Sequence, residues 1–119
     1  MRVLICGSRE WYDPDPMWRE VLEVRESSGL EVIIHGGARG ADKLAGAIAK
    51  QLKIKVMEFP AEWDAFGKKA GPMRNQKMLD EGKPDLVLAF HEDYDNSKGT
   101  RDMVKKATRA KIPVKIFSE

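Results

Sequence analysis

Three short segments of the chain combine glycine with arginine or hydroxyl residues, a combination suited to binding a phosphate group. They read CGSREW (6–11), HGGARGAD (35–42) and FHEDYDNSKGT (90–100). Glycine has no Cβ, so a neighbouring backbone amide can approach an anion closely. Arginine adds a permanently charged, bidentate donor. A helix that begins directly after such a segment contributes unpaired N–H groups and a partial positive charge.

The candidate ligand-binding residues come from all three segments. They are Gly7, Ser8 and Arg9, then Gly36, Gly37, Arg39, Gly40 and Asp42, and finally Ser97, Gly99 and Thr100. Each type of residue also has a simpler explanation. Glycine often serves only a turn, arginine is commonly solvated or ion-paired, and an acid suits the first turn of a helix. Taken together, the three segments favour phosphate binding over turn chemistry alone.

A second cluster of candidates follows the third apolar run, in FPAEW (59–63) and GKKAGPMRN (67–75). Trp63 and Phe66 have rings on which a base could stack. Arg74 and Asn75 could reach the edge of that base or a phosphate. Trp63 has an equally good alternative role, because its ring could simply anchor the connection over the core.

The pattern of apolar residues predicts a Rossmann-like α/β fold. Strands are expected at 2–6, 30–35, 55–59, 85–90 and 113–117, alternating with helices from Asp15 as N-cap, over 40–52, about 71–81 and about 99–110. This alternation favours a single three-layer domain over 1–119, with a five-stranded, mainly parallel sheet in the order 3-2-1-4-5. The connection 60–71 is expected to be a long functional loop.

This topology would bring the glycine-containing segments together. Ligands of open parallel sheets bind beyond the carboxyl ends of the strands, where the strand order reverses. In the order 3-2-1-4-5 that point lies between the first and fourth strands. The segments after the first, second and fourth strands are therefore expected to line one crevice.

Composition and familiar motifs exclude several other classes of function. The charge of +2, from 21 basic and 19 acidic residues, is too balanced for a non-specific nucleic-acid binder. The single cysteine, Cys6, favours a reducing compartment, and no apolar run approaches membrane-spanning length, so the cytoplasm is the expected location. DYDNSKG departs from a calcium loop at Lys98, and neither histidine has partners at zinc spacing, so no metal site is predicted.

The combination of motifs resembles the YspA-like branch of the SLOG superfamily. CGSREW, HGGARGADKLA, FPAEW, KKAGPMRNQKML, PDLVLAF and SKGTRDMVKKA occur in the order found in that branch. The superfamily also contains the lonely-guy phosphoribohydrolases and DprA. The resemblance implies a Rossmann-like domain that binds a nucleotide or nucleotide-derived ligand such as ADP-ribose, as a sensor or sponge. Related members often pair through helices, so a homodimer is also implied.

The same resemblance bears on catalysis. SKGT corresponds to the glycine–threonine phosphate loop of the superfamily, which in the lonely-guy enzymes reads P-G-G-x-G-T-x-x-E, and that glutamate takes part in cleaving an N-glycosidic bond. Met103 stands at the glutamate position, and the adjacent Asp102 lies roughly 100° away around a helix. An enzyme would therefore use Asp102, or an acid of 92–95, with Arg74 stabilising charge. Binding is the leading hypothesis, a nucleotide glycosidase or phosphoribohydrolase the second, and a single-stranded nucleic-acid module the last.

Overall fold

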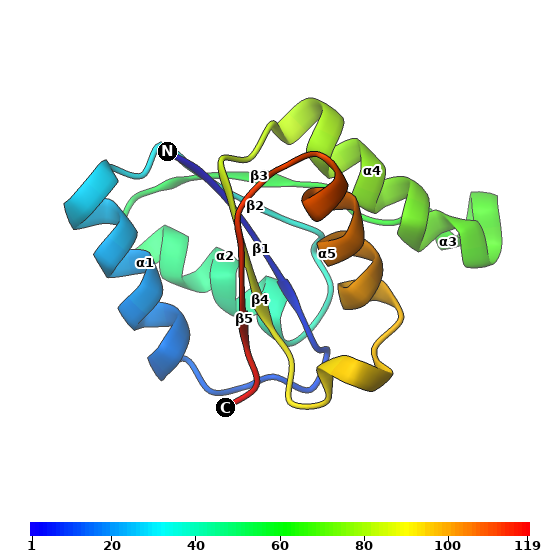
Figure 1. Cartoon of the computed structure of the whole chain (residues 1–119), viewed down its shortest axis with the longest axis horizontal. Coiled ribbons are helices and arrows are strands. Elements are labelled where there is room, and N and C mark those ends of the chain that lie inside the picture. Colours follow the sequence, from blue (N-terminus) through cyan, green and yellow to red (C-terminus); the bar gives the residue numbers. More distant parts are fainter.

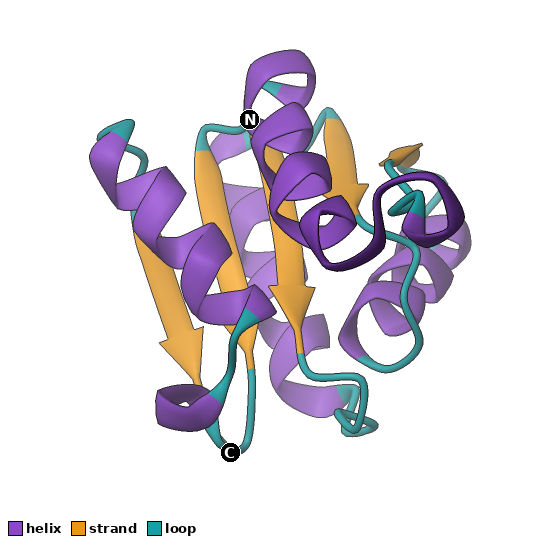
Figure 2. Ribbon diagram, turned by 90° about the vertical axis from the view of Figure 1, so that its right-hand side faces the viewer, coloured by secondary structure: helices purple, strands orange, loops and turns teal.

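A five-stranded parallel sheet forms the centre of the structure, a computed structural model that describes residues 1–119. The strands are β1 (Arg2–Gly7), β2 (Val32–His35), β3 (Lys55–Glu58), β4 (Leu86–Phe90) and β5 (Val114–Phe117). Their order is β3-β2-β1-β4-β5, and every neighbouring pair is parallel. The predicted α/β class, strand order and strand direction are confirmed (Figures 1 and 2).

Helices cover both faces of this sheet. They are α1 (Asp15–Ser28), α2 (Ala41–Gln51), α3 (Trp63–Phe66), α4 (Ala70–Gly82) and α5 (Gly99–Arg109), with 3₁₀ turns at Gly67–Lys69 and Tyr94–Asn96. Helices α1 and α2 lie on one face, and α4 and α5 on the other (Figure 1). None of the helices combines the length and apolar character that crossing a lipid bilayer requires.

The core is divided by the alternating side chains of the central strands. Val3 and Ile5 of β1 pack with the α1–α2 layer, whereas Leu4 packs with the α4–α5 layer. Successive side chains of a strand point to opposite faces, so a strand buried on both faces must be apolar throughout. Accordingly β1, β2 and β4 are largely or wholly buried, while the edge strands β3 and β5 are mostly exposed.

Two details differ from the sequence predictions. Helix α1 begins at Asp15 itself, because the Oδ1 atom of Asp13 accepts the N–H of Asp15 at 3.0 Å and supplies the local acceptor. The expected loop over 60–71 contains α3 and a 3₁₀ turn, and α4 already begins at Ala70.

Three of the helices are followed closely by a lysine with a positive φ angle. These are Lys53 after α2, Lys83 after α4 and Lys111 after α5, with φ angles of 57°, 49° and 62°. Helices commonly end at a residue in the left-handed backbone conformation. That residue is usually glycine, because a Cβ makes the left-handed conformation less favourable. All three helices thus stop at the amino edge of the sheet by the same device.

Candidate functional site

The predicted segments meet in a cavity of about 70 Å³ beyond the carboxyl ends of β1 and β4, which we call the switch-point cavity. Seven of the predicted site residues line it: Gly7, Arg9, Asp42, Arg74, Asn75, Gly99 and Thr100. Cys6, Ala38 and Met78 complete the lining and were not predicted. The strand order explains why these segments meet. The strands β1 and β4 are neighbours, but the chain after β1 leads to one face of the sheet and the chain after β4 leads to the other, which leaves a crevice between them.

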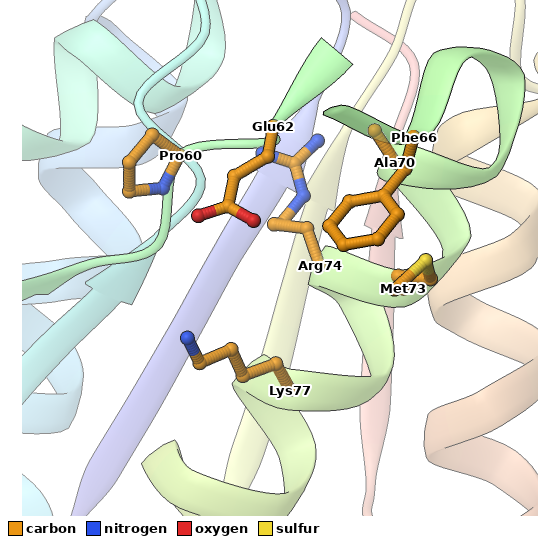
Figure 3. Close-up of a pocket in the computed structure, with 7 residues that line it drawn as sticks. All are labelled: Pro60, Glu62, Phe66, Ala70, Met73, Arg74 and Lys77. Carbon is orange, nitrogen blue, oxygen red and sulfur yellow. The ribbon is translucent and has the colours of Figure 1, made fainter. Parts of the chain in front are cut away.

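Two further hollows share residues with this cavity. The Trp63 hollow, of about 150 Å³, is lined by Arg9, Gly36, Gly37, Ala38, Pro60, Ala61, Trp63 and Arg74. The Phe66 hollow, of about 240 Å³, is lined by Pro60, Glu62, Phe66, Ala70, Met73, Arg74 and Lys77 (Figure 3). Arg74 is the one residue that lines all three spaces, so it lies at the centre of the site.

Arg74 reaches across the glycine-rich segment from α4. Its Nη1 atom donates to the carbonyl oxygens of Gly36 at 2.8 Å and Phe59 at 3.4 Å, and its Nε atom donates to Oδ1 of Asn75 at 3.1 Å. A Cβ at position 36 would collide with the guanidinium group, so glycine is required there for this approach.

The charge of Arg74 has only neutral partners at hydrogen-bonding distance. None of the ion pairs within 4.0 Å involves Arg74, and its Nη2 atom has no hydrogen-bond partner. Burial lowers the pKa of this half-buried guanidinium, with the charge of Asp42 acting in the opposite direction. Arginine nevertheless stays protonated in proteins, so a cation is held here without a directly paired anion.

Asp42, in the first turn of α2, provides a buried carboxyl group in the wall of the switch-point cavity. The residue is only 7% exposed, and its Oδ2 atom accepts the N–H of Ala38 at 3.1 Å. Burial raises its pKa from 3.8 to about 6, although the Ala38 hydrogen bond and the charge of Arg74 oppose that rise. The carboxyl group can therefore exchange a proton close to neutral pH.

The backbone amides of the segment after β2 are largely used inside the protein. Gly37 donates to Nδ1 of His35 at 2.9 Å, Ala38 donates to Asp42, and Ala41 donates to the carbonyl of Ser8 at 3.0 Å. Burial lowers the pKa of His35, which fits a neutral ring that accepts at Nδ1. The glycine-rich sequence predicts that these amides hold a phosphate, whereas in the structure they donate to acceptors within the protein.

Gly40 has a packing role that the sequence did not reveal. Its φ angle is +78°, and a Cβ there would run into the backbone of Ser8 and Arg9. The bare backbone of Gly40 thus allows the segments after β1 and β2 to touch directly.

The start of α5 is the part of the site with free backbone donors. The N–H groups of Gly99, Thr100 and Arg101 donate to no backbone carbonyl, and the first such bond runs from Asp102 to Lys98 at 3.0 Å. The side-chain amide of Asn75 holds this helix in place by donating to the carbonyl of Gly99 at 3.2 Å. Helix N-termini favour anions through these donors and through the helix dipole.

Three predicted residues have side chains committed elsewhere. Arg39 is exposed, and its Nη2 atom lies 2.6 Å from Oε1 of Glu10. The hydroxyl of Ser8 donates to Oε1 of Glu92, and that of Ser97 donates to the carbonyl of Tyr94, each at 2.7 Å. These three side chains therefore contact other groups of the protein.

Asp102 does not line the switch-point cavity. Its Oδ2 atom accepts from the side-chain amide of Asn75 at 3.0 Å, and its Oδ1 atom lies 2.6 Å from Nζ of Lys106. The carboxylate thus helps to join α4 and α5, and Asp42 is the acid in the cavity wall. The predicted catalytic role of Asp102 remains untested.

Trp63 lies at the surface above the site. Its side chain is 47% exposed, the guanidinium carbon of Arg9 is 5.8 Å from the ring centroid, and its ring leans on Gly71, where a Cβ would be 3.2 Å away. An exposed aromatic face beside a cation is suited to stacking, although the contact with Gly71 also fixes α3 against α4.

The residues of the Phe66 hollow were mostly missed, although their spacing carries a signal. Ala70, Met73, Arg74 and Lys77 lie at i, i+3, i+4 and i+7 on α4 and therefore share one face of that helix. The residues opposite them, Glu62 and Phe66, belong to the connection whose short helix was not predicted.

Comparisons with known proteins agree with this architecture. The chain is 39% identical over 125 residues to the Gene 61 protein of Mycobacterium phage D29, covering 99% of this chain and 97% of that protein. Its fold is similar to that of UDP-GlcNAc 2-epimerase from Neisseria meningitidis, in a crystal structure with UDP-GlcNAc, with a TM-score of 0.60 and 18% identity. That match covers 98% of this chain but only 32% of the epimerase, so it concerns the fold alone.

The model of one family matches the amino-terminal half of the chain. It spans residues 1–66, which include β1, the glycine-rich segment after β2, and α3. The homodimer implied by the superfamily resemblance stays a prediction. With this match and the near full-length phage relative, the chain belongs to the YspA, cpYpsA-related SLOG family.

Proposed function

We propose that this protein binds a nucleotide or nucleotide-derived ligand, such as ADP-ribose, by its sugar phosphate in the switch-point cavity. The SLOG family and a Rossmann-like fold support a nucleotide-related ligand in general terms. The finer proposal depends on the residues that line the cavity. Binding without turnover would suit a sensor or a sponge for such a ligand.

Arg74 provides the observation that carries the proposal. A half-buried cation normally has an anion beside it, because removing a charge from water is costly unless the charge is paired. Arg74 lacks such a partner within 4.0 Å and keeps its Nη2 atom free, at the edge where ligands of this fold bind. A phosphate group would supply the missing anion through a charge-assisted hydrogen bond.

The distribution of donors and acceptors suggests how the ligand lies. The free amides at Gly99 and Thr100, with Arg74 and Arg9, favour the phosphate at the α5 side of the cavity. The carboxyl group of Asp42, in the wall formed by α2, is suited to accept hydrogen bonds from sugar hydroxyls. A cavity of about 70 Å³ holds only part of a nucleotide, so the remainder would extend into the Trp63 hollow.

Calorimetric titration with ribose 5-phosphate tests this proposal without assuming a base. We expect saturable binding of ribose 5-phosphate and tighter binding of ADP-ribose, whose second phosphate and second ribose can reach the Trp63 hollow. A single-stranded oligonucleotide serves as a comparison and should bind weakly and in a salt-dependent way. The proposal fails if neither ribose 5-phosphate nor any nucleotide binds at millimolar concentration.

Hydrolysis of an N-glycosidic bond is a second candidate function, favoured by the position of Asp42. An acid whose pKa is raised to about 6 can protonate a departing base at neutral pH, as general acids of glycoside hydrolysis do. Water would add to the anomeric carbon as its bond to the base breaks, and its proton would pass to the solvent, from which Asp42 is protonated again. Chromatography of nucleoside monophosphates after incubation decides the matter, and an unchanged nucleotide despite tight binding would eliminate hydrolysis.

A further inference from the structure

The Phe66 hollow is a second open space beside Arg74. At about 240 Å³ it is the largest of the three spaces that Arg74 lines. It shares Pro60 and Arg74 with the Trp63 hollow, so the two hollows adjoin at these residues. Phe66 and Met73 remain 45% and 46% exposed, which leaves apolar surface available to a ligand.

Polar and apolar groups lie on different sides of this hollow. Figure 3 shows the Glu62 carboxylate and the Lys77 side chain on one side, with Phe66 and Met73 on the other and Arg74 between them. Glu62 and Lys77 take part in none of the side-chain hydrogen bonds or ion pairs of the chain, so both are free to bind a ligand. One acceptor group and one donor group therefore border a partly aromatic space.

We propose that the Phe66 hollow binds the purine base of the ligand and selects guanine over adenine, with Glu62 as the specificity-determining residue. The inference deepens the proposed function and rests on it. Guanine presents the N1–H and N2–H₂ donors side by side, and a carboxylate can accept both at once. The neighbouring O6 and N7 atoms of guanine are acceptors, which suit the ammonium group of Lys77.

Adenine does not fit the same pair of charges. Its N1 atom is an acceptor, so it would face the Glu62 carboxylate with no proton between them, and its N6 amino group would face Lys77. A site built for a particular hydrogen-bond pattern rejects an analogue that leaves its polar groups unpaired. The ring of Phe66 and the guanidinium plane of Arg74 offer stacking surfaces that are common to all purines.

Titration of the protein with GMP, IMP and AMP tests the selectivity. IMP keeps N1–H and O6 but lacks the N2 amino group, so we expect affinities in the order GMP, IMP, AMP, with GMP at least about 10-fold tighter than AMP. Glu62→Gln should reduce the ratio of GMP to AMP affinity to less than about 3-fold and leave ribose 5-phosphate binding unchanged. Asp64→Asn, which removes a nearby acid of α3 outside this hollow, should preserve the ratio.

The outcomes separate this inference from the proposed function. Equal affinity for GMP and AMP, or a preference that survives Glu62→Gln, overturns the guanine assignment while ribose 5-phosphate binding still supports a nucleotide site. Absence of binding by ribose 5-phosphate and all three nucleotides overturns both. Phe66→Ala provides a further measurement, because stacking predicts weaker binding of GMP and AMP alike and no change for ribose 5-phosphate.

Discussion

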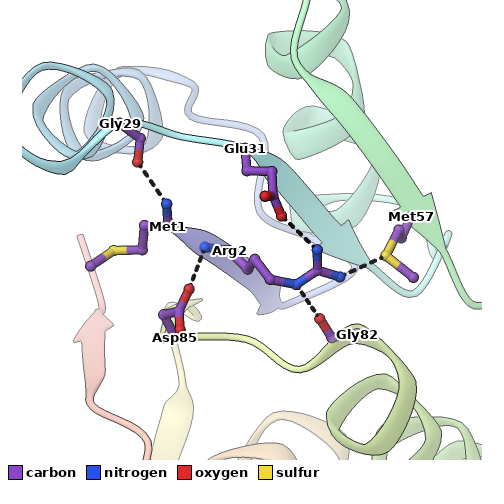
Figure 4. A network of polar contacts seen from close by, with 7 residues as sticks. All are labelled: Met1, Arg2, Gly29, Glu31, Met57, Gly82 and Asp85. Atoms are coloured by element: carbon purple, nitrogen blue, oxygen red, sulfur yellow. Dashed lines mark hydrogen bonds and ion pairs between the residues drawn. The ribbon is translucent and has the colours of Figure 1, made fainter.

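An arginine donates to a glycine carbonyl at each end of the parallel strands, the amino edge and the carboxyl edge of the sheet. Only one of these two arginines has an anion beside it. At the amino edge, Arg2 donates from Nε to Gly82 at 2.7 Å, from Nη1 to Glu31 at 2.7 Å and from Nη2 to the sulfur of Met57 at 3.2 Å (Figure 4). At the carboxyl edge, Arg74 donates from Nη1 to the carbonyl oxygen of Gly36 but lacks a carboxylate within 4.0 Å.

This difference separates a structural role from a binding role. The groups of the amino edge satisfy one another, since the backbone N–H of Arg2 also donates to Asp85 at 2.7 Å and the Met1 amino group donates to Gly29 at 3.1 Å. The carboxyl edge keeps an unpaired cation and free amides at the start of α5. Arg2, whose three side-chain nitrogens all have partners, holds the fold together, whereas Arg74, whose Nη2 atom has no partner, can bind a ligand.

Removing Arg74 should have the largest effect on ligand binding. Arg74→Ala is expected to weaken ribose 5-phosphate binding roughly 100- to 1000-fold, equal to about 3 to 4 kcal/mol, because the buried charge partner of the phosphate is lost. Arg74→Lys should recover only part of this loss, since an ammonium group cannot reproduce the planar fork. Calorimetric titration measures both.

Arg39→Ala is the matched control for Arg74→Ala. The Arg39 side chain is exposed and paired with Glu10, so its removal should change the affinity for ribose 5-phosphate less than about 2-fold. Equal losses of ribose 5-phosphate affinity in the two variants would mean that Arg39 also contacts the ligand. The result would contradict the assignment of Arg74 as the binding arginine.

Asp42→Asn should make the protein more stable at pH 8 and leave its stability nearly unchanged near pH 4. The pKa of Asp42 is about 6 in the folded state against 3.8 ordinarily, so the unfolded state releases this proton first as pH rises. The wild-type free energy of unfolding therefore falls between about pH 4 and 6, by up to about 3 kcal/mol. Urea unfolding across this range measures the effect, and a variant less stable than wild type at pH 8 would contradict it.

Arg2→Ala should have a smaller effect, and on stability alone. The variant loses hydrogen bonds at the amino edge, but Glu31 is 63% exposed and its ion pair contributes little. We expect a decrease of about 1 to 2 kcal/mol in the free energy of unfolding, measured in urea, with ribose 5-phosphate affinity unchanged. A loss of affinity would show that the two edges are coupled.

The fold was largely predictable because its determinants are local. The apolar runs predict the strands, and the amphipathic segments between them predict the helices. The strand order then follows from the general rules for connections between parallel strands. The start of α1 was misplaced because Asp13 and Asp15 are both plausible acceptors, and only the geometry distinguishes them. The helix α3 was missed since four residues give no periodic signal.

The site was predictable in position but not in its individual contacts. Arg39 and Arg74 were both candidates, and the guanidinium that contacts Gly36 is that of Arg74, 38 residues further along the chain. Asp42 and Asp102 were likewise both candidates, and Asp42 lies in the cavity wall whereas Asp102 contacts Lys106. Which side chain reaches a cavity depends on tertiary packing, which the spacing of residues does not encode.

The lysines that end α2, α4 and α5 offer a way to strengthen the scaffold without altering the binding surface. Lys53, Lys83 and Lys111 all have positive φ angles, and none of them lines the three spaces around Arg74. Glycine adopts this conformation without the strain of roughly 1 kcal/mol that a Cβ brings. Replacing the three lysines by glycine would thus raise the free energy of unfolding. Destabilising substitutions around Arg74 could then be introduced one at a time without unfolding the protein.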